Sequence, residues 1–434
     1  MRAEPAQLVA LKREIGPIGS AALAFNGLVG TGIFALPAAL AMTFAGWSPF
    51  LFLSFGAAAL LIVIAMARAA AMFEGSGGPV AYAREAFGPL ASFQLGWIYY
   101  VARVSAFAAN TLVFVDYAGA LLPGAESQAF RLGLALALIA ALTLVNVIGV
   151  KSASRLLDAV TLLKGLPLLA TAVIGLLLFA GNAPAPGHLP AFSTIEANAL
   201  LIFYAFIGFE TSVVPAGETK DPTKTIPRAL VTTVILTALL YFLVQYAFLA
   251  VMTGREVAEA IRPLVTVANV VFGPVGGLVM AGAVLFSVAG NSMGSMLSTP
   301  RITFALAEAK AFPAWFGAIS ARFATPANSI LFMGAAAGLL TATGSFAALA
   351  VMSTLARLIV YLVSAAALPM IRWRRRAAGL GVDLAFSGGG AAICLWAIAQ
   401  APWPAWRVLL IFLAIGLALF GLALALRRGG GGSF

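Results

Sequence analysis

Residues 26–37 read Asn-Gly-Leu-Val-Gly-Thr-Gly-Ile-Phe-Ala-Leu-Pro, in the middle of a long apolar stretch near the N-terminus. Three glycines and a proline are poor material for one continuous helix, because these residue types have the lowest helix propensities. Within hydrocarbon, backbone groups that a break sets free must find partners in protein or in a water-lined cavity. If the surrounding chain lies in a membrane, this stretch predicts a helix interrupted midway.

The composition places the chain in a membrane. Charged residues make up 9% of the 434 residues and apolar residues 62%, against roughly 25% and 45–50% in soluble domains. An ordinary water-facing surface cannot be built from so few charges, so the bilayer is expected to act as the solvent. The net charge of +11 does not indicate a nucleic-acid binder, because the basic residues do not gather on one soluble face.

The apolar stretches predict helices as the spanning elements. A membrane-spanning helix needs about 20 mostly apolar residues, and runs such as 132–145 and 408–426 lack the alternating polarity of a membrane barrel. We therefore expect an all-α membrane protein with 12 transmembrane helices. The expected spans are 18–44, 47–73, 88–122, 131–149, 156–180, 195–216, 228–252, 272–299, 326–343, 346–369, 384–400 and 404–427.

The basic residues orient these spans. Most Lys and Arg residues fall in alternate loops on one side, and the positive-inside rule assigns that side to the cytoplasm. Both termini are then cytoplasmic, and the protein is expected to be multi-pass in the cytoplasmic (inner) membrane. Only Arg131, Arg255, Arg262 and Arg407 fall in loops assigned to the opposite side.

A second interruption is expected in the sixth span. Residues 203–212 read Phe-Tyr-Ala-Phe-Ile-Gly-Phe-Glu-Thr-Ser, with Pro215 following. Taken alone, such glycines also suit close packing between membrane helices. Interruptions in the first and sixth of ten helices, however, occupy matching positions of two five-helix halves, which is the sequence sign of an inverted-repeat transporter.

A broken helix offers a site for a small zwitterion. It exposes N–H groups at the start of its second half and C=O groups at the end of its first half, so an anion site and a cation site lie side by side. The N–H groups near Thr31, Gly32 and Ile33 are expected to hold a carboxylate. Carbonyls near Leu28, Val29, Phe206 and Ile207 are expected to hold an ammonium. The predicted substrate-binding residues are Leu28, Val29, Gly30, Thr31, Gly32, Ile33, Tyr204, Phe206, Ile207, Gly208 and Phe209.

Several motifs in order resemble one family. Residues 30–34 read Gly-Thr-Gly-Ile-Phe, which resembles the G-x-G-I-F signature of the amino acid-polyamine-organocation (APC) superfamily. Residues 76–89 look like the cytoplasmic loop between helices 2 and 3 of that family. Residues 206–210 with 216–228 resemble its F-x-G-F-E and E-x-K-x-P-x-x-x-I-P pattern, and residues 301–313 resemble the stretch after helix 8.

The resemblance implies a LeuT-like fold and alternating access. In that fold a 5+5 inverted repeat forms the transport core, here 16–370, with repeat one at about 16–180 and repeat two at about 193–370. Residues 371–428 then supply a cytoplasmic loop and two C-terminal helices, and residues 1–15 and 429–434 are tails. Arg103, Phe114 and Tyr117 are similar to helix 3 of the L-type amino acid transporters, although Val104 replaces the proline that follows the arginine there.

Lys164 is an ionisable residue inside the fifth span. Its burial costs at least about 3 kcal/mol, so a functional role or a dedicated partner is expected. The resemblance implies that this lysine stands in for the cation that bridges helices 1 and 8 in sodium-coupled relatives. It is then expected to donate to carbonyls near Gly27 and Gly30. Proton coupling through Lys164 is one hypothesis, and a permanently charged strut in an exchanger is the other.

Other polar and aromatic residues within spans have two interpretations each. Glu210 is either a partner of Arg103 or a residue that faces the cavity, and Arg357 is a member of an ion pair or part of a gate. Asn291 and Ser295, one turn apart, either line the pocket or form interhelical hydrogen bonds. The aromatic rings of Tyr204, Phe206 and Phe209 either close over the substrate or pack in the core.

The residue inventory favours transport over catalysis. His188 lies in an outer loop and Cys394 stands alone in a span, so no cofactor or metal site is expected. There is no nucleotide-binding loop and no nucleophile constellation, so an enzyme or a primary pump is not expected. The expected partners are an amino acid, the lipid bilayer and protons, with the chain a monomer or a homodimer. Neutral amino acids are preferred because the pocket is apolar, and a cationic amino acid or polyamine antiporter is the alternative.

Overall fold

The structure is a computed structural model. It describes residues 13–75, 77–119, 121–122, 127–149, 153–252, 256–257 and 260–429, and of 153–163 and 426–429 the backbone alone. Ser76 of the predicted cytoplasmic loop, Arg255 and most of both predicted tails lie outside these residues. The regular secondary structure of the described residues is helical, apart from one isolated bridge between Ile15 and Thr219. The prediction of an all-α membrane fold is therefore confirmed.

The long helices follow the predicted spans closely. Ten helical runs among the described residues are long and apolar enough to cross a membrane. The count of 12 crossings and the repeat boundaries stay predictions. The α-helices are α1 (Pro17–Leu28), α2 (Thr31–Phe44), α3 (Ser48–Ala70), α4 (Pro79–Phe87), α5 (Pro89–Ala118), α6 (Gln128–Ile148), α7 (Ala153–Phe179), α8 (Phe192–Tyr204), α9 (Pro222–Val251), α11 (Pro263–Ser298), α12 (Pro300–Glu308), α13 (Ala327–Thr343), α14 (Phe346–Arg374), α15 (Leu380–Ala399) and α16 (Trp403–Gly429).

Two stretches are not single regular helices. The sixth span, 195–216, is interrupted as the sequence predicted, since α8 ends at Tyr204 and two short 3₁₀ turns follow, Phe209–Ser212 and Ala216–Glu218. The eighth span starts earlier than expected, because α11 runs from Pro263 through a kink at Gly273, whose φ is 73°. A proline follows that glycine, which accounts for the kink.

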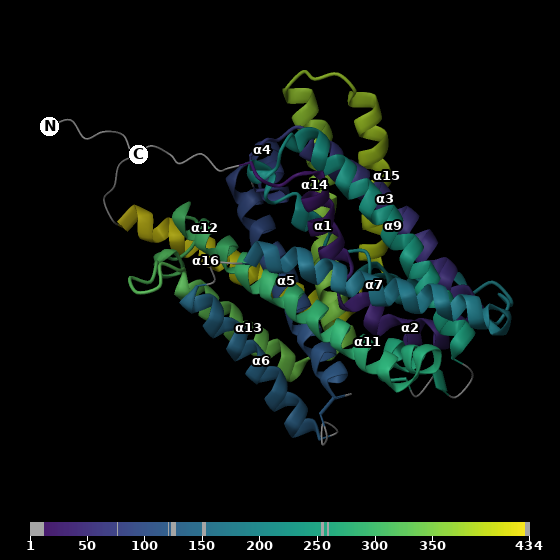
Figure 1. The fold of residues 1–434 in the computed structure, drawn as a ribbon. Coiled ribbons are helices and arrows are strands. Elements are labelled where there is room, and N and C mark those ends of the chain that lie inside the picture. The colour runs from purple at the N-terminus through teal and green to yellow at the C-terminus, as the bar shows by residue number, and fades with distance from the viewer. Residues whose placement is uncertain are drawn as a thin grey trace.

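The helices form one bundle around the two interrupted elements (Figure 1). Helix α3 packs along α9, and α5 packs along α14, so that α1 and α8 are enclosed by longer helices. Helices α6 and α13 lie side by side at one edge, and α14 and α15 form a hairpin that extends from the bundle (Figure 1). At the start of α1, the N–H of Lys220 donates to the carbonyl of Ile15 at 2.8 Å, which ties the entry of α1 to the exit of the sixth span.

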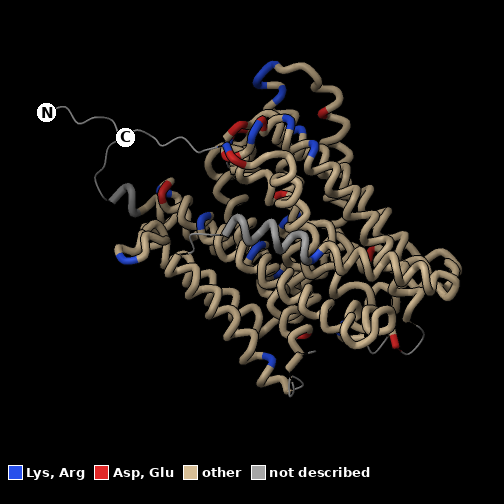
Figure 2. The backbone as a smooth tube through the Cα atoms, in the orientation of Figure 1, with Lys and Arg blue, Asp and Glu red and all other residues tan. Residues whose placement is uncertain are grey.

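Charged residues gather at one end of the bundle. Figure 2 shows Lys and Arg concentrated where α14 turns into α15 and around the neighbouring loops. There Arg68 and Arg372 both donate to Asp383, whose side chain is fully buried. Arg375 donates to both oxygens of Glu85 at 2.8 and 2.7 Å. A membrane protein needs such a charged belt at the interface, where water and headgroups solvate it.

Candidate functional site

The first helical element breaks within the stretch 26–37. Helix α1 ends at Leu28, and Val29 (ψ 72°) and Gly30 (φ −106°, ψ −146°) leave helical geometry before α2 starts at Thr31. Gly30 donates its N–H to the carbonyl of Leu28 at 2.8 Å, which closes a tight turn. The N–H groups of Thr31, Gly32 and Ile33 donate to no acceptor within the described residues. They are the unpaired donors expected at a helix start.

The sixth span breaks after Tyr204. Gly208 has φ 109°, a left-handed conformation that glycine adopts without strain, and this residue turns the chain into the 3₁₀ turn Phe209–Ser212. The carbonyls of Phe206 and Ile207 accept no hydrogen bond from the described part of the chain. The second break therefore carries free acceptors, whereas the first carries free donors.

The two breaks touch each other through glycine. A Cβ added to Gly27 would lie 2.8 Å from the carbonyl carbon of Gly208, and one added to Gly32 would lie 2.9 Å from Cα of Ala205. Neither position has room for a side chain. Because the backbones meet directly, the free N–H groups at the start of α2 lie next to the segment that carries the free carbonyls.

Three buried polar side chains surround the start of α2. The hydroxyl of Thr31 donates to Oδ1 of Asn110 at 2.7 Å and lies 3.0 Å from the hydroxyl of Tyr204. Since the Thr31 proton is used on Asn110, Tyr204 must be the donor to Thr31. The exposed fractions are 2% for Thr31, 5% for Asn110 and 6% for Tyr204. These polar groups face one another within an otherwise apolar core.

Lys164 of α7 reaches the end of α1. Its amine donates to the carbonyls of Val29 at 2.8 Å and Asn26 at 3.2 Å, and also to the side-chain oxygen of Asn26. These carbonyls adjoin the pair expected from the sequence, Gly27 and Gly30. Val29, however, was predicted to hold a substrate ammonium, and its carbonyl here accepts from Lys164. Its role in substrate binding stays a prediction.

Asn291 of α11 links these two polar groups. Its Nδ2 donates to the carbonyl of Asn26 at 3.2 Å, and its Oδ1 accepts from Asn110 at 3.5 Å. Asn291 thus makes the interhelical contacts that were one of its two interpretations. Ser295, one turn on, lies 3.4 Å from the hydroxyl of Thr299. These hydrogen bonds form a continuous polar chain, which consists of Tyr204, Thr31, Asn110, Asn291, Asn26 and Lys164.

Glu210 pairs with Arg357. Its Oε1 lies 3.1 Å from Nε of Arg357, and its Oε2 accepts from the hydroxyl of Tyr361 at 2.6 Å and from the N–H of Gly208 at 2.9 Å. The carboxylate is fully buried. Through the bond to Gly208, Glu210 holds the left-handed turn at the second break.

A pairing of Glu210 with Arg103, one of its two interpretations, is not found among the described residues. Arg103 donates instead to the hydroxyls of Thr299 at 2.8 Å, Ser298 at 2.6 Å and Tyr99 at 3.1 Å. Both arginines belong to apolar spans, so the sequence could not say which one would reach Glu210. Helix α14 lies beside the second break, and this position brings Arg357 to Glu210.

The remaining aromatic residues pack in the core. Phe206 contacts the rings of Phe52 and Tyr241, and Phe209 lies 4.8 Å from the ring of Tyr361. Both side chains are 1% exposed. Tyr204 meets the ring of Phe346 edge-on, with 5.6 Å between the centroids. In this conformation these rings fill space around the breaks.

Sequence reasoning missed three residues at the breaks, Asn26, Asn110 and Tyr361. Asn26 and Asn110 are amides within apolar spans, and that setting was a signal that could have identified them. Such amides inside a bilayer are costly unless they are paired, so they mark a polar interior. Tyr361 was missed too, because an aromatic residue in a span gives no sign of the partner its hydroxyl will find.

The sequence of this chain is similar to those of known transport proteins. A family model described as amino acid permease matches residues 15–429. An uncharacterized transporter of Mycobacterium tuberculosis is 29% identical over 82% of this chain and 79% of its own length. In Bacillus subtilis, the serine/threonine exchanger SteT is 26% identical over 70% of each chain. The branched-chain amino acid permease BcaP of the same organism is 25% identical over 94% of this chain and 92% of its own.

A solved structure shares the fold. The crystal structure of MhsT in complex with L-phenylalanine superposes with a TM-score of 0.65, covering 89% of this chain and 98% of that one, at 12% sequence identity. The LeuT-like fold class that the sequence predicted is therefore confirmed.

Proposed function

Since this chain belongs to the amino acid permease family, we propose that it is a secondary active transporter that moves neutral amino acids by alternating access. The relatives named above support transport of small amino acids, serine and threonine in one case and branched-chain amino acids in another. The free energy for transport then comes from a gradient of substrate or ions. The site itself binds and orients the substrate.

One observation carries the proposal, namely the meeting of the two breaks. Unpaired N–H groups of Thr31, Gly32 and Ile33 lie beside a segment with the unpaired carbonyls of Phe206 and Ile207. An α-amino acid presents a carboxylate and an ammonium on one carbon, which matches this pairing of donors and acceptors. Oriented backbone groups in a dry interior bind each charge without any need for an ionised side chain.

The charges around the breaks favour a neutral side chain. Lys164 approaches the first break and has no carboxylate partner among the described residues, whereas Arg357 at the second break is paired with Glu210. A cationic substrate side chain would meet the positive charge of Lys164 with no free carboxylate to offset it, which disfavours such a substrate. The same charge counts against a polyamine, which also lacks the carboxylate that the free N–H groups fit.

The burial of the site supports alternating access. Val29 and Ile33 are 0% exposed, and Ile207 is 5% exposed, so a substrate reaches them only after helices move. Ile15 accepts a backbone hydrogen bond from Lys220 and donates one to Glu218, and these bonds close one route at the entry of α1. Opening on that side must separate these two segments.

We further propose that Lys164 replaces a coupling cation. Its amine occupies carbonyls at the end of α1 that a bound cation would otherwise satisfy. Whether protons drive transport then depends on whether this amine loses its proton during the cycle. If it keeps its charge throughout, the protein exchanges one amino acid for another.

The test is binding and uptake with purified protein. A thermal-shift screen against the common amino acids identifies ligands, because a compound that binds the folded state raises the melting temperature. N-acetylated and decarboxylated analogues of each ligand should give no shift. A shift with the decarboxylated analogue alone would reject the zwitterion site and favour the polyamine alternative.

A further inference from the structure

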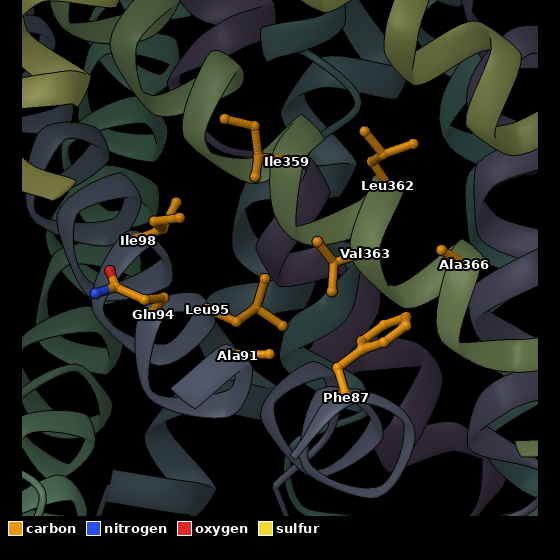
Figure 3. Close-up of a pocket in the computed structure, with 9 residues that line it drawn as sticks. All are labelled: Phe87, Ala91, Gln94, Leu95, Ile98, Ile359, Leu362, Val363 and Ala366. Atoms are coloured by element: carbon orange, nitrogen blue, oxygen red, sulfur yellow. The ribbon is translucent and has the colours of Figure 1, made fainter. Parts of the chain in front are cut away.

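A groove with a volume of about 360 Å³ lies between α4, α5 and α14, away from the two breaks. Figure 3 shows its walls, which are apolar side chains such as Phe87, Leu95 and Val363. It reaches the surface of the bundle, since Phe87 is 42% exposed and Ala366 is exposed. A surface groove of this kind in a membrane protein is open to the acyl chains of lipids.

Arginines stand at one end of this groove. Arg374 lies on the same face of α14 as Val363, about three turns further on, and its Nη1 donates to the carbonyl of Glu85, close to Phe87 at the end of α4. Arg84, which is exposed, precedes Phe87 by about one turn of α4. Arg374 is the last residue of α14, and Figure 2 shows Lys and Arg gathered where α14 turns into α15.

Nearby carboxylates do not neutralise these arginines. Glu85 is engaged by Arg375 through two hydrogen bonds, and Asp383 is shared by Arg68 and Arg372. Within the described part of the chain, Arg84, Arg374 and Arg376 have no carboxylate partner. The end of the groove thus carries a net positive charge.

We propose that this groove binds an anionic phospholipid. The phosphate contacts Arg374 and Arg84, and one acyl chain lies along Phe87, Leu95 and Val363. Each part of the lipid meets the chemistry it requires, since basic residues at the membrane surface attract anionic headgroups and apolar walls accept the chain. This inference does not depend on which amino acid is transported.

The test measures lipid binding to the purified full-length protein. Native mass spectrometry in detergent compares phosphatidylglycerol with phosphatidylethanolamine of the same chain length. The wild type should bind phosphatidylglycerol preferentially. Ala366→Trp, which fills the groove from an exposed position, should abolish this preference, and Arg374→Gln should lower the affinity about fivefold, as expected for one basic residue at the surface.

Matched controls lie elsewhere on the surface. Ala137→Trp on α6 and Arg322→Gln in the loop before α13 alter exposed residues of the same types, and both should leave lipid binding unchanged. Ala366→Phe repeats the experiment if the tryptophan lowers the melting temperature.

Three results would overturn the proposal. One is equal binding of both lipids by the wild type. Another is a loss with Arg374→Gln but none with Ala366→Trp, which would mean that the headgroup binds without the groove. The third is a change of oligomeric state with Ala366→Trp at unchanged lipid binding, which would assign the groove to a second copy of the chain.

Discussion

The amine of Lys164 on α7 lies 2.8 Å from the carbonyl oxygen of Val29, at the point where α1 ends. A helix end leaves carbonyls unpaired, and inside a membrane no water is present to satisfy them. Lys164 therefore stabilises the interrupted form of the first span. Through Asn26 and Asn291, the polar chain also connects Lys164 to Asn110 and Thr31 at the start of α2.

Replacement of Lys164 by alanine should impair transport. It leaves the carbonyl of Val29 without a donor, whereas the carbonyl of Asn26 keeps Asn291. The expected fall in maximal uptake by liposomes is on the order of tenfold, the effect of losing one buried hydrogen-bonding partner. The measurement is repeated with and without a proton gradient. Lys224→Ala, at an exposed position on α9, is the control. Unchanged gradient dependence in Lys164→Ala would reject coupling through this lysine.

Gly32→Ala should weaken substrate binding. The new methyl group would lie 2.9 Å from Cα of Ala205 and would push the start of α2 away from the second break. We expect KM to rise by roughly tenfold or more, because a misplaced donor no longer meets the carboxylate. Gly133→Ala on α6, where nothing lies within 4 Å, is the matched control and should transport normally. A normal KM for Gly32→Ala would show that the close approach is unimportant for binding.

Thr31→Val should affect substrate binding, measured as KM, more strongly than it affects the stability of the fold, measured as the melting temperature. Valine keeps the shape of threonine but removes the hydroxyl that joins Asn110 and Tyr204. Leaving these buried groups partly unpaired costs about 1–3 kcal/mol. The control is Thr111→Val, since Thr111 is also buried but bonds only the carbonyl of Phe107. Uptake kinetics and melting temperature are compared, and equal effects of the two variants on KM would contradict a special role of Thr31.

Glu210→Gln should destabilise the protein. Glutamine can still accept from Gly208 and Tyr361, but Arg357 would be left as a buried charge without its partner. Breaking a buried pair from one side costs about 3–5 kcal/mol. The double variant Glu210→Gln with Arg357→Met should recover part of this loss, which a double-mutant cycle on melting temperatures measures. Additive losses would show that the two residues do not interact.

Local sequence was enough to predict both breaks and the buried lysine. Residues 26–37 combine glycine, threonine and proline within an apolar run, and such a run cannot form one regular helix in hydrocarbon. Lys164 was recognised in the same way, because a charge within a span is costly wherever the span packs. These inferences depend on residue type and spacing alone, so they needed no knowledge of neighbouring helices.

What the tertiary structure alone decided is which groups meet. Glu210 pairs with Arg357 and not with Arg103, Asn26 and Asn110 join the polar chain, and Gly27 rests against Gly208. Each of these contacts joins residues far apart in the sequence, and every span is apolar enough to accept many neighbours. The energetic need for a partner is a property of the residue, whereas the choice of partner is a property of how the helices pack.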